Sequence, residues 1–253
     1  MSEIYWVFGF HAVNAVLQRQ PNRIEELWLQ HGRNDQRMQD LLQQANALGI
    51  HCKTVARQEL DEQAAGNHQG VMAKTKPAQT LRDRDLKQLL DTLEHQPLLL
   101  ILDGVTDPHN LGACLRTADA AGVDAVIAPK DNSAPLNGTV RKVACGAAEV
   151  MPYIQVTNLA RTLQDLQARG IWITGTAGEA EQSVYDADFS GAMALVMGAE
   201  GKGMRRLTRE NCDFLVKLPM AGSVSSLNVS VATGVCLFEV VRQRGGQSAE
   251  AGI

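Results

Sequence analysis

Five short, nearly continuous apolar runs alternate with amphipathic segments through the second half of this chain. Strands that are apolar along their whole length are buried on both faces, which is typical of a parallel sheet with helices on either side. We therefore expect an α/β fold, with strands at LLLILDGV (98–105), AVIAP (125–129), IWITGTA (171–177), ALVMGAE (194–200) and FLVKLPM (214–220). Helices are predicted after Pro108, around Val140, and over residues 157–170, 204–211 and 228–244.

The first 74 residues have shorter elements and predict a separate, smaller α/β unit. Helices are expected over residues 9–19 and 37–49, and strands over residues 24–30, 50–55 and 70–76. The polar, proline-containing segment that follows predicts a linker. We expect domains at residues 1–74 and 85–244, a linker at residues 75–84, a helix at residues 85–96 and a disordered tail at residues 245–253.

Composition restricts the classes of function. Apolar residues make up 45% of the 253 residues, enough for a substantial core, whereas aromatic residues make up only 4%. Stacking of single-stranded bases on aromatic rings is therefore not expected to be the main mode of binding. The formal net charge is −4, so contact with a nucleic acid requires a local basic face.

The cysteines and the N-terminus bear on the compartment. The five cysteines are scattered and form no C-x-x-C pair, which is typical of reduced thiols in the cytosol. The N-terminal MSEIYWVFGFHAV lacks the pattern of a secretory signal, and no apolar segment is long enough to span a bilayer. We expect a soluble cytoplasmic protein, and no metal, since no cluster has metal-ligand spacing.

The segments after the predicted strands are candidates for a ligand site, because open α/β sheets bind ligands at the carboxyl ends of their strands. One of them, G198-A-E-G-K-G203, has the form G-x-x-G-x-G. It is not the dinucleotide fingerprint, and Gly203 stands where a P-loop has Ser or Thr. Glu200 is either solvated on a plain turn or placed to meet a cationic ligand.

The segment TDPHNLGACLRTADAAG (106–122) predicts a helix with Asp107 as its N-cap and proline at the first helical position. Gly112 is unexpected there, because glycine in a helix costs about 1 kcal/mol relative to alanine. A closely approaching backbone or a ligand explains it. Arg116 forms either a surface ion pair or a fork for phosphate. Asn110 has a possible capping role, and a neighbouring histidine is expected in solvent.

The stretch AGSVSSLNVSVATG (221–234) sets small hydroxyls and an amide among apolar residues at a strand-to-helix corner. Capping of the following helix explains part of this pattern, and a bound ligand explains more. The helix itself carries a broad apolar stripe that is expected to pack against some other surface, namely Val231, Val235, Leu237, Phe238 and Val241.

Three segments together resemble the SpoU/TrmH family of RNA ribose 2′-O-methyltransferases. They are N110-L-G-A-C-L-R116, M197-G-A-E-G-K-G203 and L218-P-M-A-G-S-V-S-S-L-N-V-S-V-A-T-G234, in the family's order and spacing. The resemblance implies a Rossmann-like parallel-sheet catalytic domain that ends in a deep trefoil knot (the SPOUT class). True knots are otherwise nearly absent from proteins, and sequence patterns do not predict them. The first 74 residues look like the ribosomal protein L30e-like substrate-binding domain of the family.

The resemblance also implies an activity and a set of site residues. The expected reaction transfers a methyl group from S-adenosylmethionine to the ribose 2′-hydroxyl of a guanosine in 23S rRNA, by a homodimer joined through its knotted domains. The resemblance assigns the methyl donor to Thr176, Gly198, Leu218, Met220 and Leu227. It assigns catalysis to Asn110, Arg116, Glu200, Ser226 and Asn228.

The role of Arg116 is restricted by its chemistry. A guanidinium is effectively always protonated, with a pKa above about 12, so it is a poor general base. We expect Arg116 to hold a phosphate and lower the pKa of the 2′-hydroxyl electrostatically, while Asn110 orients the ribose or Arg116. Glu200 is expected either to orient Asn110 and Ser226 or to balance the sulfonium charge.

Alternative functions remain open at this stage. A relative acting on tRNA fits the same pattern. The presence of all five predicted catalytic residues disfavours a non-catalytic RNA-binding or ribosome-assembly factor, and the failed dinucleotide fingerprint disfavours an oxidoreductase. The residues that contact RNA are open too. The basic candidates also fit solvated helix faces, and they are Arg141, Lys142, Lys202, Arg205 and Arg206.

Overall fold

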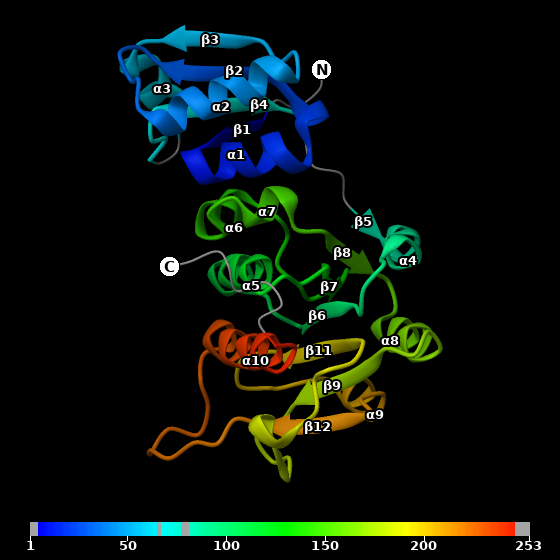
Figure 1. The fold of residues 1–253 in the computed structure, drawn as a ribbon. Coiled ribbons are helices and arrows are strands. Elements are labelled where there is room, and N and C mark those ends of the chain that lie inside the picture. Colours follow the sequence, from blue (N-terminus) through cyan, green and yellow to red (C-terminus); the bar gives the residue numbers. More distant parts are fainter. Residues whose placement is uncertain (1–4, 65–66, 77–80, 246–253) are drawn as a thin grey trace. The chain divides into compact units, whose positions relative to one another are not determined.

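The computed structural model describes residues 5–64, 67–76 and 81–245. The chain divides into two compact units (Figure 1), one of Met1–Gln79 with Ala144–Val150, the other of Thr80–Val143 with Met151–Ile253. The predicted tail at 245–253 lies outside the described residues except for Gly245, as do residues 77–80 of the predicted linker. Within the described ranges, no helix is both long and apolar enough to cross a membrane.

The first unit is built on a mixed four-stranded sheet in the order β1-β4-β2-β3, in which β4 runs antiparallel to β1 and β2. Helices α1 and α2 pack on one face, and Leu60 of α3 packs on the other with Val55 and Met72. Its elements are β1 (Tyr5–Phe8), α1 (Phe10–Arg19), the 3₁₀ helix η1 (Pro21–Arg23), β2 (Ile24–Gln30), α2 (Gln36–Ala47), β3 (Cys52–Val55), α3 (Arg57–Gln63), β4 (Val71–Thr75) and α7 (Ala147–Val150).

The second unit contains an eight-stranded sheet in which every pair of neighbours is parallel, in the order β10-β12-β9-β11-β6-β7-β8-β5. The prediction of a parallel α/β sheet is confirmed, and all five predicted strands are present. Its strands are β5 (Leu81–Arg82), β6 (Leu98–Asp103), β7 (Ala125–Pro129), β8 (Tyr153–Val156), β9 (Trp172–Thr176), β10 (Gln182–Ser183), β11 (Met193–Gly198) and β12 (Phe214–Lys217).

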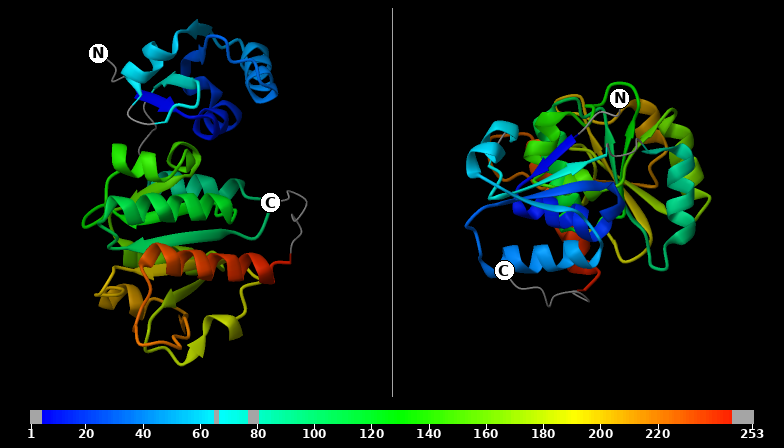
Figure 2. Two further views of the ribbon diagram at one scale, coloured as in Figure 1. Left: turned by 90° about the vertical axis from the view of Figure 1, so that its left-hand side faces the viewer. Right: turned by 90° about the horizontal axis from the view of Figure 1, so that it is seen from above.

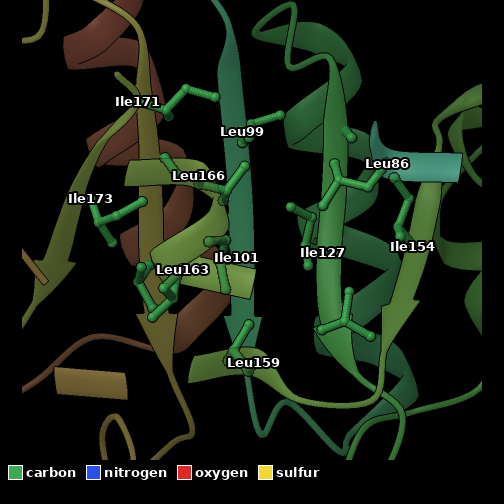
Figure 3. Packing of buried hydrophobic residues seen from close by; sticks show 14 residues of the cluster. Leu86, Leu99, Ile101, Ile127, Ile154, Leu159, Leu163, Leu166, Ile171 and Ile173 are labelled. Carbon is green, nitrogen blue, oxygen red and sulfur yellow. The ribbon is translucent and has the colours of Figure 1, made fainter. Parts of the chain in front are cut away.

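Helices cover both faces of this sheet (Figure 2). On one face, α4 and α8 supply Leu86, Leu159, Leu163 and Leu166 to a cluster with the aliphatic side chains of the central strands (Figure 3). Each such side chain contributes about 1.5–3 kcal/mol by leaving water. The helices are α4 (Asp83–Thr92), α5 (Pro108–Ala120), α6 (Gly138–Val143), α8 (Leu159–Gln167), α9 (Arg206–Glu210) and α10 (Val229–Gln243), with η2 (Val184–Asp186) as a 3₁₀ turn.

The opposite face is covered by α5 and α10, which pack against each other. On α10 the buried positions are Val229, Thr233, Cys236, Leu237, Glu239 and Val240. Of the predicted apolar stripe, Leu237 is buried within this unit, whereas Val231 and Phe238 have exposed fractions of 53% and 50%. At 100° per residue, Val231 lies on the opposite side of the helix from the buried Val240.

Candidate active site

The carboxyl edge of the second sheet contains a reversal of strand order. From β6 the chain adds β7 and then β8 on one side, whereas β9, β11 and β12 lie on the other side of β6. Gly198 at the end of β11 is paired in register with Asp103 at the end of β6. Such a switch point opens a crevice at the carboxyl ends of the strands, where ligands of open α/β sheets bind.

The connection from β6 to α5 brings Asn110 to this edge. The predicted cap is confirmed, because the Asp107 carboxylate accepts a hydrogen bond from the His109 amide at 3.1 Å and proline takes the first helical position. Asn110 follows in the first turn of α5 and is 8% exposed. A buried amide needs partners for its donors and its acceptor, and these come from two distant segments.

The first of these segments is the glycine-rich loop after β11, which forms a tight hairpin. Ala199 and Gly203 exchange both backbone hydrogen bonds, at 3.0 and 2.8 Å. Gly201 and Gly203 have positive φ angles of 76° and 66°, a region that favours glycine. A Cβ on Gly198 would lie 2.3 Å from the backbone of Gly203, so the hairpin closes only over a glycine.

Three predicted catalytic residues meet through their side chains. Asn228 Nδ2 donates to Asn110 Oδ1 at 2.9 Å, and Asn110 Nδ2 donates to Glu200 Oε2 at 3.4 Å. Asn228 is also the N-cap of α10, since its Oδ1 accepts the Ser230 amide at 2.9 Å. The chain of hydrogen bonds fixes both amides with their donors directed toward the exposed carboxylate of Glu200. We call Asn110, Glu200 and Asn228 the amide–carboxylate triad.

The other two predicted catalytic residues lie outside the triad. Arg116 is exposed on α5, six residues after Asn110, which corresponds to about 240° around the helix. The two side chains therefore leave α5 from different sides. Ser226 is exposed on the connection from β12 to α10, two residues before Asn228.

The predicted cofactor residues come from the ends of three neighbouring strands and from the β12–α10 connection. Thr176 ends β9, and its Oγ1 donates to the Val196 carbonyl on β11 at 3.1 Å. Leu218 and Met220 follow β12 and are half-buried, while Leu227 is exposed. Since β12, β9 and β11 are adjacent in the sheet, the structure brings these segments to the same edge.

The β12–α10 connection extends away from the sheet before it returns to α10 (Figure 1). In the described part of the chain, residues 219–227 form no hydrogen bonds, either through their backbone or through their side chains. Backbone N–H and C=O groups are strong hydrogen-bonding groups that are normally paired when they are buried. Most of this connection is exposed, so its backbone acceptors, and its donors other than at Pro219, are accessible to a bound molecule.

Gly112 has a structural explanation. A Cβ at this position would lie 2.7 Å from the Val143 Cβ and 2.8 Å from the Val140 carbonyl oxygen. Of the two explanations for this glycine, a close backbone or a ligand, the first applies, and the approaching segment is α6.

Arg205 and Arg206, which are among the five basic candidates for phosphate contact, have acidic partners. Arg205 Nε donates to Asp103 Oδ1 at 2.6 Å, and Arg206 pairs with Glu210 along α9 at 2.7 Å. Lys202 is exposed on the hairpin. Asp103 is a site-edge residue that the sequence reasoning missed, although an acidic residue that ends an otherwise apolar strand was a visible signal.

Two cysteines of the second unit are poor nucleophiles. Burial raises the pKa of Cys114 to about 11 and the pKa of Cys212 to about 12, so both thiols are protonated near neutral pH and are weak nucleophiles. Among the described residues, no group of three or more His, Cys, Asp or Glu side chains is placed to hold a metal ion.

Comparison with known proteins gives consistent matches over both units. The SpoU rRNA methylase family matches residues 97–238, and the RNA 2′-O ribose methyltransferase substrate-binding family matches residues 6–81. The 23S rRNA (guanosine-2′-O-)-methyltransferase RlmB of Pseudomonas aeruginosa is 64% identical over 244 residues, covering 96% of this chain and 98% of that protein. RlmB of Vibrio cholerae is 62% identical over 239 residues, covering 94% of this chain and 96% of that protein.

A solved structure shares the fold. The SpoU methyltransferase AviRb from Streptomyces viridochromogenes, in complex with the cofactor AdoMet, has a TM-score of 0.74 at 24% identity. The match covers 95% of this chain and 90% of that one.

Proposed function

From the premise that this chain belongs to the SpoU rRNA methylase family, we propose that it methylates the ribose 2′-hydroxyl of a guanosine in 23S rRNA, with S-adenosylmethionine as methyl donor. The observation that carries this proposal is the amide–carboxylate triad, which joins three separate segments at the switch point of the sheet. The near full-length relatives named for this reaction support the substrate.

The residues at the carboxyl edge fit the proposed cofactor. S-adenosylmethionine, when bound, supplies a methyl group already activated by a sulfonium charge. The unpaired backbone groups of residues 219–227 suit the edges of an adenine, and the apolar side chains of Leu218, Met220 and Leu227 suit its faces. Gly198 and Thr176 border the same edge, and the exposed Glu200 carboxylate is the nearby charge of opposite sign to a sulfonium.

The chain's own residues then have to position the ribose and assist loss of its proton. In this proposal Arg116 binds a phosphate next to the reacting sugar and stabilises negative charge on the 2′-oxygen. Asn110 orients the ribose, and its amide is held by Glu200 and Asn228. Ser226 contributes a hydroxyl from the β12–α10 connection. The proton passes to phosphate or water, since the guanidinium is not a base.

In this proposal the C-terminal end of the second unit forms a deep trefoil knot. The path of the chain supports it: β9 lies between β11 and β12, and the chain returns after β12 to pack α10 on α5. The segment that precedes β11 also holds the end of α10. Gln243 Nε2 donates to the Ala187 carbonyl at 2.8 Å, and Arg244 Nη2 donates to the Gly191 carbonyl at 2.6 Å.

A homodimer joined through the knotted domains accounts for the exposed apolar side chains near the knot. Val224 on the β12–α10 connection is 60% exposed, and Val231 and Phe238 lie seven residues apart on α10. A spacing of seven places both on one side of a helix. We assign this side of α10, with Val224, to the subunit interface.

The division of labour between the domains is part of the same proposal. Residues 1–74 bind RNA through an L30e-like fold, and residues 85–244 transfer the methyl group in the cytoplasm, where ribosomal RNA is found. The two family matches and the mixed sheet with helices on both faces support this assignment.

Mapping of 2′-O-methylation in total RNA tests the proposal. Cells lacking the gene should lose one guanosine mark in 23S rRNA, and the wild-type gene should restore it. Asn110→Ala should fail to restore the mark, whereas His109→Ala, at the exposed neighbouring position, should restore it. Loss of a tRNA mark instead would favour the tRNA alternative, and an unchanged methylation map would favour a non-catalytic RNA-binding factor.

A further inference from the structure

A buried carboxylate lies at the base of the candidate site and belongs to none of the apolar clusters described above. Asp103 ends β6, and its side chain is fully inaccessible to solvent. Charged groups are almost never buried without a partner, because removing a charge from water is costly. The two oxygens of Asp103 find their partners on a single residue, Arg205, which lies 102 positions further along the chain.

The contact between the two residues has two components. The Arg205 backbone amide donates to Asp103 Oδ2 at 2.8 Å, and its Nε donates to Asp103 Oδ1 at 2.6 Å. Arg205 is half-exposed, with its guanidinium at the surface and its backbone at the sheet edge. Two hydrogen bonds to one carboxylate fix the orientation of Arg205 relative to Asp103 as well as the distance between the two residues.

The contact also lies at the exit of the glycine-rich hairpin. Residues 199–203 form the hairpin, Met204 follows, and Arg205 is the N-cap of α9. Met204 packs into the sheet's core next to Gly175 of β9, whose added Cβ would lie 2.8 Å from the Met204 Cε. The end of the hairpin is therefore attached to β9 through Met204 and to β6 through Asp103.

The same carboxylate is connected to the other half of the site. Asp103 is followed by Gly104, with a φ of 87°, and then by the turn that leads into α5 and Asn110. The Asp103–Arg205 contact thus joins the base of the segment that carries Asn110 to the base of the hairpin that carries Glu200. The Asn110–Glu200 hydrogen bond, at 3.4 Å, is the only described contact between those two side chains, and it is a long one.

We propose that Asp103 and Arg205 are positioning residues that hold the hairpin of residues 199–203 in the place where Glu200 meets Asn110 and the methyl donor binds. This inference rests on the proposed function for its consequence in catalysis. Neither residue touches the reacting atoms. Their effect passes through the hairpin, because a hairpin with two glycines at positive φ has little stiffness of its own.

The principal test uses Arg205→Ala, which removes the Nε bond and leaves the backbone bond to Asp103. Isothermal titration with S-adenosylmethionine should show about tenfold weaker binding, the loss expected for one hydrogen bond to a charged group. The KM for 23S rRNA should stay unchanged, since the hairpin rather than the RNA surface is affected. Arg205→Lys keeps a cation for Asp103 and should recover most of the affinity.

Hydrogen–deuterium exchange gives a readout independent of methyl transfer. The amides of Ala199 and Gly203, which close the hairpin, should exchange faster in Arg205→Ala and in Asp103→Asn than in the wild type. Arg169→Ala is the matched control. Arg169 forms an ion pair with Asp91 at 2.7 Å, and this pair does not lie at the edge of the sheet that carries the candidate site. This variant should change neither exchange nor donor binding.

The outcomes separate this inference from the proposed function. Unchanged hairpin exchange in Arg205→Ala, or faster exchange with unchanged donor affinity, would overturn the positioning role. A wild-type protein that binds no S-adenosylmethionine would instead contradict the proposed function. Hairpin exchange would still decide whether Asp103 and Arg205 hold the hairpin in such a protein.

Discussion

Two glycines inside helices of the second unit show how the surrounding atoms decide whether a substitution raises or lowers the free energy of unfolding. Glycine lowers helix stability by about 1 kcal/mol relative to alanine, so both positions carry an intrinsic cost. At Gly112 of α5 an added Cβ meets Val143 and the Val140 carbonyl at less than 3 Å. At Gly234 of α10 the nearest atom, Cγ2 of Thr117, is 3.7 Å away, an ordinary contact.

We predict opposite effects for the two alanine substitutions. Gly234→Ala should raise the free energy of unfolding by about 0.5–1 kcal/mol. Gly112→Ala should lower it by about 1–3 kcal/mol, because overpacking outweighs the helix propensity. Thermal unfolding of the two variants beside the wild type measures both. An increase in melting temperature for Gly112→Ala would show that α6 moves away at little cost.

Single residues of the site were predictable to different degrees. Asn110, Glu200 and Asn228 stand in motifs, and the hydrogen bonds between them agree with a shared site. No spacing in the sequence indicates that Asn110 contacts Asn228 across 118 residues, since that contact depends on α10 returning to α5. Asp103 was missed because its role depends on Arg205 reaching the end of a strand distant in sequence.

At the scale of the elements, the C-terminal half of α10 carries a network of polar contacts. Glu239 accepts hydrogen bonds from Arg242 and Gln243 although its side chain is largely buried, and Gln243 in turn contacts the backbone of Ala187 and Phe189. The hydrogen bonds from Arg242, and then from Gln243, lower the pKa of Glu239 to about 2. The ionised carboxylate thus organises the end of the helix.

We predict a pH-dependent contribution of Glu239 to stability. Because its pKa is lower in the folded chain than the value of about 4.3 in an unfolded one, its contribution is present above pH 4.3 and is lost as the pH falls toward 2. Glu239→Gln should therefore melt below the wild type at pH 7, and this difference should shrink between pH 5 and pH 3. Glu210→Gln, in the exposed pair with Arg206, is the control.

A difference in melting temperature that stayed constant across this pH range would contradict the predicted pKa of Glu239.

Most elements of the second unit were predictable because they are long and apolar. Strand β8, of four residues, was missed because YIQV has one polar residue among three others and follows a proline directly. Strands β5 and β10 have two residues each, which is too short to show an alternation of apolar and polar residues. They are recognised as strands only by their pairing with β8 and β12. In the first unit, β1 was missed because it leads within two residues into α1.

At the scale of the whole molecule, the exposed side of α10 leads to a prediction about assembly. Phe238→Glu and Val231→Glu each place a charge in the proposed interface, where an unpaired charge is strongly unfavourable. We expect both variants to be monomers by sedimentation velocity at concentrations where the wild type is a dimer. Leu207→Glu is the control, because Leu207 is 53% exposed on α9 outside the proposed interface. A wild-type monomer would contradict the proposed dimer.

The overall architecture was predictable in its fold class but not in its strand order. Alternating apolar runs gave the parallel sheet, but they do not determine the strand order, in which β9 lies between β11 and β12. The last helix also contacts segments far away in the sequence, namely α5 and, at its C-terminal end, residues 187–191. A local sequence pattern reports on residues that are close along the chain, so it does not predict contacts between segments that are far apart in the sequence.

The bond between Asn228 and Asn110 has a consequence for biosynthesis. About nine-tenths of the polypeptide has left the ribosome's peptidyl-transfer centre before Asn228 is added. Strands β6 to β8 and helix α5 can already be in place by then, since translation adds about 5–20 residues per second and domains begin to fold as they emerge. A nascent or prematurely terminated chain that stops short of α10 thus lacks the amide that holds Asn110, and under the proposed function it should not transfer a methyl group.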